Sequence, residues 1–261
     1  MQHAASKKGY HMEDERTVKI KVQNLSKHFG DLVVLDDISF NIHKGEFLCV
    51  VGPTGCGKTT FCNVVTSLLP VTSGSITIDG EAIDFKKHNV AFCFQEPSCL
   101  PWRTVYDNIK IGLSIKNVPE QEIPDRVNHI MELTGLTKFR DFYPNQLSAG
   151  TKQRVVVARA FVTEPDMLLM DEPFGQLDTS TRFHIENLLI ELWQKTGQTV
   201  IFVTHNLEES VYLAERVLVL TPKPTHVKEI VDVRHLPHPR NIADPEFVRL
   251  RNHVTDLVKW W

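Results

Sequence analysis

A glycine-rich segment constrains this chain more than any other feature. It reads Gly52-Pro53-Thr54-Gly55-Cys56-Gly57-Lys58-Thr59-Thr60, and it follows the apolar run 47–51 and precedes the helix-like stretch 61–69. A strand, such a loop and a helix in this order are typical of a phosphate-binding loop, whose glycines let backbone N–H groups close around phosphate oxygens. The N-terminal end of the helix and Lys58 add positive charge, and the Thr59 hydroxyl is placed to ligate Mg²⁺. We expect the chain to bind a nucleoside triphosphate.

Composition is that of an ordinary globular protein. The 261 residues suffice for a large α/β domain with an inserted subdomain. A net charge of −3 without a long basic run argues against nucleic acid as a partner. The five cysteines are odd in number and lack C-x-x-C spacing, so we expect reduced thiols rather than disulfides or a zinc site. No apolar stretch approaches the roughly 20 residues of a membrane span, and the start does not resemble a signal peptide.

Strand and helix patterns alternate along the chain. Residues 18–22 and 39–42 alternate as edge strands do, and further strands are expected at residues 47–51, 75–78, 90–94, 167–170, 199–203 and 217–220. Helices are expected at residues 61–69, 105–113, 120–134, 151–161, 181–195, 207–213 and 245–261. The alternation predicts a mostly parallel sheet.

The same patterns suggest a division of the chain. We expect a flexible polar tail at residues 1–16 and a core at residues 17–220. A helical subdomain at approximately 97–162 is expected to be inserted into that core, and residues 221–261 are expected to form a C-terminal extension with a helix.

A second motif for phosphate chemistry lies at residues 167–172. Four apolar residues end there in Asp171 and Glu172, which places both carboxylates at the C-terminal edge of a buried strand. Open α/β sheets bind their ligands at that edge. Asp171 can hold Mg²⁺ through its water shell, and Glu172 can polarise an attacking water.

A third motif lies between these two and reads Leu147-Ser148-Ala149-Gly150-Thr151-Lys152-Gln153-Arg154. At this point the chain resembles the ATP-binding-cassette (ABC) ATPases, whose signature reads Leu-Ser-Gly-Gly-Gln, then a basic residue, Gln and Arg. The resemblance spans roughly residues 18–220, with the motifs in the order of the family. It implies an α/β fold, in which a P-loop NTPase core carries an N-terminal antiparallel β subdomain and an inserted α-helical subdomain. It also implies ATP and Mg²⁺ as cofactors.

The resemblance assigns roles to further residues. Phe29 matches the aromatic residue that stacks on adenine, and Gln95 matches the glutamine that joins the core to the helical subdomain and senses Mg²⁺ and water. Asp178 ends the segment that crosses the dimer, and His205 matches the switch histidine that contacts the terminal phosphate. The predicted catalytic residues are Lys58, Gln95, Glu172 and His205, and the predicted metal ligands are Thr59, Gln95 and Asp171. The predicted nucleotide-binding residues are Phe29, Gly52, Pro53, Thr54, Gly55, Cys56, Gly57, Lys58, Thr59, Thr60, Ser148, Gly150 and Asp178.

The signature departs from the family pattern at two residues. Ala149 replaces the first glycine, and Thr151 replaces the glutamine. Ser148 and Gly150, which in the family cap the ATP held by the opposite subunit, are retained. Alanine is harmless where the backbone φ is negative and costly where it is positive. We therefore expect weaker capping at most, with the hydrolytic residues intact.

A segment after Gln95 resembles one subgroup of the family. Leu100-Pro101-Trp102-Arg103, followed by Asp107-Asn108, is similar to the ATPase subunits of nitrate, sulfonate, taurine and bicarbonate importers, as is the tail pattern at 238–251. The segment puts apolar surface beside the glutamine, where the coupling helix of a membrane partner would dock. The alternative is that Trp102 packs within its own subdomain, and the sequence leaves both readings open.

The leading hypothesis is the ATPase subunit of an importer, peripheral to the cytoplasmic face of the inner membrane. Two head-to-tail copies, expected to be identical, would sandwich two ATP molecules. Their motion would drive permease subunits docked at Leu100-Pro101-Trp102, and a solute-binding protein would deliver the solute to the permease. One alternative is a soluble ABC mechanoprotein, although the second cassette, coiled coil or basic surface usual in such proteins is not seen. The other is a regulatory subunit that binds ATP without hydrolysis, which Glu172 and His205 argue against.

Overall fold

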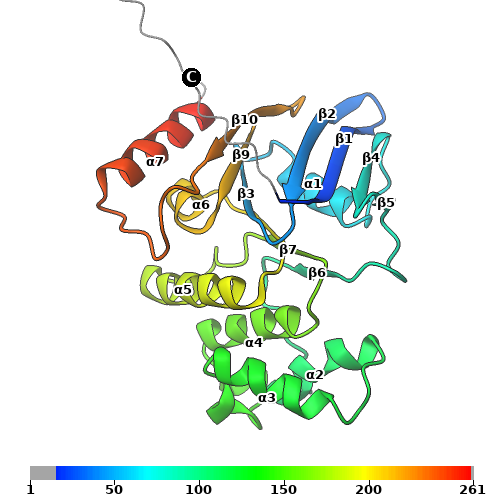
Figure 1. The fold of residues 1–261 in the computed structure, drawn as a ribbon, viewed down its shortest axis with the longest axis vertical. Coiled ribbons are helices and arrows are strands. Elements are labelled where there is room, and N and C mark those ends of the chain that lie inside the picture. Colours follow the sequence, from blue (N-terminus) through cyan, green and yellow to red (C-terminus); the bar gives the residue numbers. More distant parts are fainter. Residues whose placement is uncertain (1–15, 260–261) are drawn as a thin grey trace, which may run out of the picture.

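The computed structural model describes residues 16–259 and shows two β-sheets beside a group of helices (Figure 1). The expected tail at 1–16, apart from Arg16, and the terminal Trp260-Trp261 lie outside the described residues.

The central sheet has six strands in the order β10-β9-β3-β8-β7-β6. Its strands are β3 (Phe47–Val51), β6 (Val90–Cys93), β7 (Met167–Asp171), β8 (Val200–Val203), β9 (Arg216–Leu220) and β10 (Val227–Asp232). The pairs from β9 to β6 are parallel, which confirms the prediction, whereas the unpredicted β10 is antiparallel to β9. The carboxyl ends of β3, β7, β8 and β9 therefore meet at one edge of the sheet.

A second, antiparallel sheet has the strand order β2-β1-β4-β5. Its strands are β1 (Val18–Phe29), β2 (Leu32–His43), β4 (Ser73–Ile78) and β5 (Glu81–Ala82). The prediction that residues 18–22 form an edge strand is wrong, because β1 pairs with β2 on one side and β4 on the other. The alternation in β1 reflects two unlike faces, since Ile20 and Val22 are buried while Lys21 and Gln23 are exposed. Residues 39–42 do lie in an edge strand, β2.

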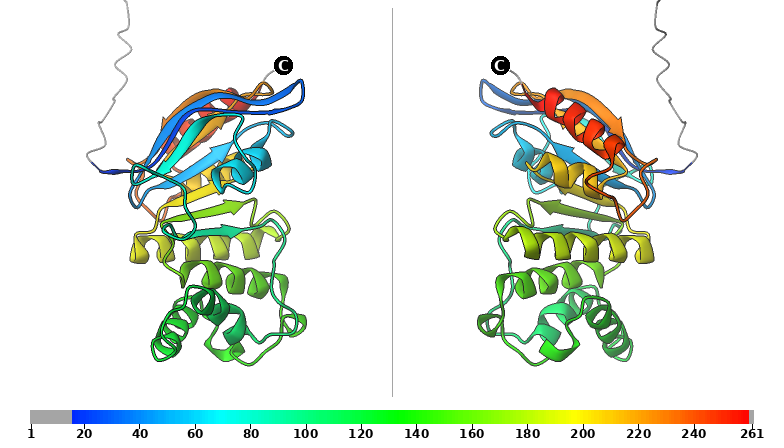
Figure 2. Two further views of the ribbon diagram at one scale, coloured as in Figure 1. Left: turned by 90° about the vertical axis from the view of Figure 1, so that its right-hand side faces the viewer. Right: turned by 90° about the vertical axis from the view of Figure 1, so that its left-hand side faces the viewer.

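The helical portion lies between β6 and β7 along the chain and occupies the lower part of Figure 1. It contains α2 (Val105–Ile115), α3 (Ile123–Leu133), the short 3-10 turns η1 (Thr137–Phe139) and η2 (Pro144–Gln146), and α4 (Ala149–Phe161). The other helices are α1 (Lys58–Val65), α5 (Thr179–Thr196), α6 (Leu207–Leu213) and α7 (Pro245–Val258). The two views of Figure 2 show α4 and α5 stacked between the sheets and helices α2 and α3, and α4 packs directly on α5.

Strand β3 divides the hydrophobic core in two. Phe47, Cys49 and Val51 belong to the cluster formed with the helical portion and helices α5 to α7. Leu48 and Val50 belong to the cluster formed with α1 and the antiparallel sheet. Successive side chains of a strand point to opposite faces, so a strand covered on both sides is apolar throughout. This double burial places the loop after β3 on a rigid support.

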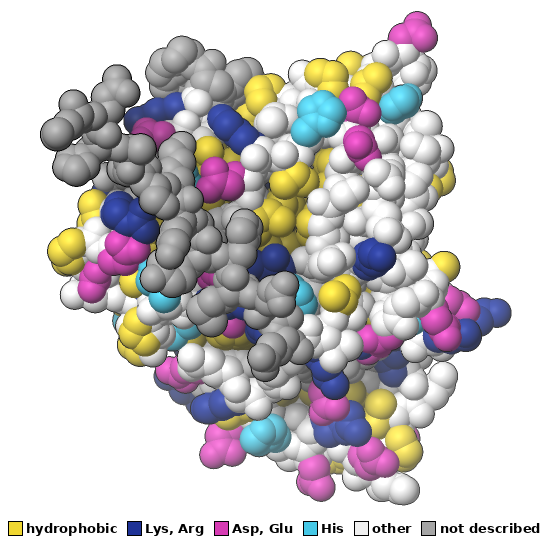
Figure 3. Space-filling model, turned by 45° about the horizontal axis from the view of Figure 1, so that its top comes forward, with side chains coloured by type: hydrophobic (Ala, Val, Ile, Leu, Met, Phe, Trp, Pro, Cys, Tyr) yellow, Lys and Arg dark blue, Asp and Glu magenta, His cyan; other side chains and the backbone are white. Residues whose placement is uncertain are grey.

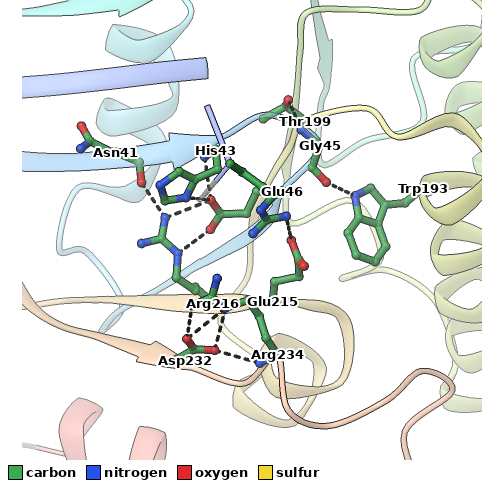
Figure 4. A network of polar contacts seen from close by, with 11 residues as sticks. Asn41, His43, Gly45, Glu46, Trp193, Thr199, Glu215, Arg216, Asp232 and Arg234 are labelled. Atoms are coloured by element: carbon green, nitrogen blue, oxygen red, sulfur yellow. Dashed lines mark hydrogen bonds and ion pairs between the residues drawn. The ribbon is translucent and has the colours of Figure 1, made fainter. Parts of the chain in front are cut away.

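A buried carboxylate joins the two sheets (Figure 4). Glu46 is fully buried and accepts hydrogen bonds from Arg216 Nε at 2.6 Å, from Arg216 Nη2 at 3.0 Å and from His43 N at 2.7 Å. Arg216, the first residue of β9, also donates to Asn41 O of β2 at 2.6 Å. Removal of Arg216 would leave the Glu46 carboxylate buried without its partner, which is costly. The network therefore holds the antiparallel sheet against the central sheet.

The C-terminal extension packs on the central sheet through β10 and α7. Arg240 is buried and donates to Val211 O of α6 and to Val233 O, the latter at 2.8 Å. Burial lowers the pKa of Arg240 to about 10, so the guanidinium stays charged at neutral pH. Arg251 of α7 pairs with Glu208 of α6 at 2.9 Å. The extension thus holds α6, the helix that follows His205.

The described surface is mixed in charge. On the face shown in Figure 3, acidic and basic side chains of the described residues are interspersed. Among the helices within residues 16–259, none combines the length and the apolar character needed to cross a lipid bilayer.

Candidate nucleotide-binding and catalytic site

The phosphate loop forms the turn between β3 and α1. Gly57 is the N-cap of α1 with a φ of 107°, and Gly55 has a φ of 77°, both in the region that favours glycine. Lys58 Nζ donates to Gly52 O at 3.0 Å and to Pro53 O at 3.3 Å, so the buried ammonium is held inside the loop. A fixed cation at the positive end of a helix makes this turn an anion site.

Two side chains with oxygen atoms that can bind a metal ion lie at the loop. The Thr59 side chain lies close enough to the carboxylate of Asp171, the last residue of β7, to favour its charged form. Burial raises the pKa of Asp171, and the neighbouring charge of Glu172 raises it further. A divalent cation would offset both effects, and a hydroxyl beside a carboxylate is the kind of ligand pair that Mg²⁺ takes. These residues therefore fit the predicted metal.

Glu172 and His205 contact each other where β7 and β8 end. His205 Nδ1 lies 2.8 Å from Glu172 Oε2, and the two side chains are 60% and 21% exposed. Glu172 has a φ of 45°, which is costly for a residue other than glycine and is typical of functional sites. The pair can take up a proton from a water molecule and hold it, which suits the activation of water at the end of a phosphate chain.

An open cavity of about 500 Å³ brings eight of the predicted residues together. It is lined by Thr54, Gly55, Gly57, Lys58, Thr59, Thr60, Glu172, His205 and the unpredicted Lys223. Gly52, Pro53 and Cys56 are buried in the loop beside it. The other predicted residues that do not line it are Phe29, Gln95, Ser148, Gly150, Asp171 and Asp178.

Three predicted residues lie apart from the cavity in the single chain. Phe29 ends β1 and is 47% exposed. Gln95 follows β6, and its Nε2 lies 3.8 Å from the position that a Cβ on Gly175 would take. Asp178 is the N-cap of α5 and accepts from Thr181 N at 3.0 Å. The roles of these residues toward nucleotide stay predictions.

The signature forms the N-terminus of α4. Ser148 is the N-cap and accepts from Thr151 N at 3.2 Å. Ala149 is the first residue of the helix and has no positive φ, so it replaces glycine without backbone strain. Gly150 is buried, and a Cβ there would overlap with the Cγ2 methyl of Thr181 on α5. Packing within the chain therefore disfavours a larger residue at 150, because the Thr181 methyl would have to move.

A buried carboxyl pair lies behind the turn that carries His205. Thr204 Oγ1 donates to Glu209 of α6 and accepts from Asn206 N at 3.0 Å, which fixes the turn that carries His205. Burial raises the pKa of Glu209 to about 8 from its ordinary 4.5, and the nearby Glu186 of α5 adds to the rise. Between these two pH values the folded protein keeps a proton that the unfolded chain releases. The contribution of Glu209 to the free energy of unfolding therefore decreases as the pH rises through this window.

One lining residue was missed because no motif contains it. Lys223 lies between Pro222 and Pro224, in the turn from β9 to β10. The position of Lys223 shortly after an apolar strand could have indicated it. The other predicted site residues at this edge of the sheet also follow strands.

The site can hold a triphosphate in the loop and present its last phosphate to a carboxylate and a histidine, which is the chemistry of a P-loop nucleoside triphosphatase. Comparison with known proteins gives the family. The model of the ABC transporter family matches residues 35–175. An uncharacterised ABC transporter ATP-binding protein of Methanocaldococcus jannaschii is 41% identical over 250 residues, which cover 94% of this chain and 93% of that protein.

Two further relatives carry functional information. The aliphatic sulfonates import ATP-binding protein SsuB of Bacillus thuringiensis is 38% identical over 239 residues, which cover 90% of this chain and 94% of that protein. A solved dimeric post-hydrolysis state of an ATP-binding cassette, bound to ADP and Pi, matches with a TM-score of 0.70 and 30% identity over 82% of this chain and 99% of that chain. The chain belongs to the ABC transporter family, as an ATP-binding subunit that hydrolyses ATP. The expected cassette fold is confirmed.

Proposed function

We propose that this chain is the ATPase subunit of an importer for a small anionic solute of the nitrate, sulfonate or taurine kind. The importer assignment is supported by the sulfonate import protein that is 38% identical over 239 residues. Solute selection is assigned to partner subunits, a permease and a solute-binding protein. The chain itself supplies the work of ATP hydrolysis at the cytoplasmic face of the membrane.

The observation that carries this proposal is the way Trp102 is presented. The Trp102 side chain is 71% exposed, which argues against the alternative that it packs within its own subdomain. The loop behind it is rigid, because the fully buried Asn108 accepts from Leu100 N at 2.7 Å and donates to Leu100 O at 3.1 Å and to Arg103 O at 3.0 Å. A rigid loop with an outward tryptophan is the form of an interface anchor. We assign it to the permease.

The catalytic roles follow from the geometry of the cavity. Lys58 holds the phosphates, Glu172 takes the proton of the attacking water, and His205 orients Glu172 and contacts the terminal phosphate. Thr59 and Asp171 would hold Mg²⁺, Gln95 is the further ligand that we propose, and the metal would neutralise charge on the phosphates when bound. The 2.8 Å contact between the Glu172 carboxylate and His205 favours a subunit that hydrolyses ATP over a regulatory subunit. A subunit that only binds ATP does not need a group that activates water.

The partner that completes the site is a second copy of the chain. The cavity is open, and Ser148, Gly150 and Asp178 do not line it within one chain. In the proposed head-to-tail dimer, the signature of each copy covers the phosphate loop of the other. The dimeric state of the related cassette bound to ADP and Pi supports this arrangement.

The test is co-purification of the chain with a candidate permease produced in the same cells. Trp102→Ala is expected to weaken the complex by about 2–4 kcal/mol, as a buried interface tryptophan does, without a change in basal ATPase activity or melting temperature. The matched control is Leu68→Ala, which removes another exposed apolar side chain far along the chain from this loop. If Trp102→Ala lowers the melting temperature while assembly is unchanged, the permease assignment is wrong.

A further inference from the structure

The turn between β9 and β10 is built against the phosphate loop. Thr225 Oγ1 donates to Cys56 O in the centre of that loop. Thr225 also bonds β2, because its N–H donates to Val34 O at 3.0 Å and its carbonyl accepts from Asp36 N at 2.9 Å. Thr221 Oγ1 accepts from His226 N at 2.8 Å and so closes the turn. The turn that carries Lys223 is therefore held in place by the nucleotide site itself.

Lys223 brings a positive charge into the cavity. It lines the same cavity as Lys58, Glu172 and His205, and its side chain is exposed. Within residues 16–259, no carboxylate or carbonyl forms a hydrogen bond or an ion pair with its ammonium group. Its charge also reaches the loop, since it partly offsets the rise in the pKa of Cys56 that burial causes.

The strand order indicates which part of a nucleotide Lys223 faces. β3 lies between β8 and β9, with β7 beyond β8. Glu172 and His205 follow β7 and β8, so the terminal phosphate belongs on that side of the loop, whereas Lys223 follows β9 on the other side. The turn is bonded to β2, and β2 pairs with β1 at Leu32 and Phe29, the predicted adenine contact. Lys223 thus lies between the catalytic side and the adenine side.

We propose that Lys223 is a second cation of the nucleotide site, which contacts the α- and β-phosphates of the bound nucleotide. The contact is common to ATP and ADP and contributes to the affinity of both. Lys58 and Lys223 then flank the phosphate chain from the loop and from the C-terminal hairpin. The orientation of the nucleotide rests on the proposed roles of Glu172 and His205, whereas the inference is independent of the importer assignment.

The test is nucleotide binding to the full chain by calorimetry, in the Glu172→Gln background so that ATP is not consumed. Lys223→Ala should raise the Kd of ATP and of ADP by the same factor, about 3- to 30-fold for one partly exposed charge-assisted hydrogen bond. Lys223→Arg should stay within about threefold, because it keeps the charge, and Lys223→Glu should bind more weakly than Lys223→Ala. Adenosine, which lacks phosphates, should bind all variants alike.

The matched control is Lys228→Ala, which removes the same charge from the same hairpin. Lys228 Nζ donates to Leu257 O at 2.5 Å and does not line the cavity, so nucleotide affinity should be unchanged. In the enzyme with Glu172 intact, Lys223→Ala should raise KM and leave kcat near the wild-type value. An unchanged Kd for ATP and ADP, or a loss confined to ATP, would overturn the proposal. ATP binding by the Glu172→Gln chain with Lys223 intact shows separately whether the site takes ATP.

Discussion

The packing of Gly150 allows a sharp test of what the signature glycine is for. A Cβ at this residue would overlap with the Cγ2 methyl of Thr181, while Thr181 Cβ at 3.8 Å and Ile185 Cδ1 at 3.9 Å would be ordinary contacts. The obstacle is thus a single methyl group on α5. Gly150→Ala should force that methyl aside, and Thr181→Ser should remove it while keeping the backbone N–H that Asp178 accepts at 3.0 Å.

The expected magnitudes follow from this one contact. Overpacking a buried site costs about 1–3 kcal/mol. Alanine is better than glycine in a helix by about 0.5–1 kcal/mol, so the net destabilisation by Gly150→Ala should lie between about 0 and 2.5 kcal/mol. In the Thr181→Ser background the collision is absent and only the helix preference is left, so the same substitution should stabilise by about 0.5–1 kcal/mol.

The assay is urea unfolding of the four chains of this double-mutant cycle, with ATPase activity measured in parallel. If Gly150→Ala has the same effect in both backgrounds, the packing argument is wrong. If the Thr181→Ser background restores stability and turnover together, the glycine is required for packing alone. If stability returns and turnover does not, Gly150 has the additional role across the dimer that we propose.

Two further predictions concern the signature and the carboxyl pair. Ala149→Gly should change ATPase turnover by less than about threefold, because Ala149 is an unstrained and exposed helix residue; a rise of about tenfold, measured in a phosphate-release assay, would show that the native signature is impaired. Wild-type stability should fall between about pH 6.5 and pH 8, because the pKa of Glu209 is raised to about 8, whereas at lower pH His238, whose pKa burial lowers from 6.5 to about 4, acts in the opposite direction. Glu209→Gln should flatten that dependence by about 1–4 kcal/mol in urea unfolding, and a slope equal to the wild type would contradict the assignment.

Linear motifs were predictable from the sequence because they depend on short-range order. The strand at 47–51 and the helix at 207–213 have the predicted bounds. The phosphate loop and the pair Asp171 and Glu172 occupy the expected sheet edge, since each follows an apolar strand directly. These features need only a few consecutive residues to be specified.

Long-range pairing was not predictable in the same way. The alternation of β1 describes its two faces but not its two neighbours, β2 and β4, which lie later in the chain. Strand β10 is half exposed and is defined mainly by its pairing with β9. The overlap of Gly150 with Thr181 and the place of Lys223 in the cavity likewise depend on segments brought together by the fold.

The central claim is that Glu172 activates the water that hydrolyses ATP, in a site that two copies of the chain complete. The most direct measurement combines ATP turnover with light scattering of the Glu172→Gln variant, with and without ATP. We expect turnover to fall by about 10²–10⁴-fold, ATP binding to persist, and a dimer to accumulate only when ATP is present. Turnover within a few fold of wild type, or a variant that stays monomeric with ATP bound, would contradict the account.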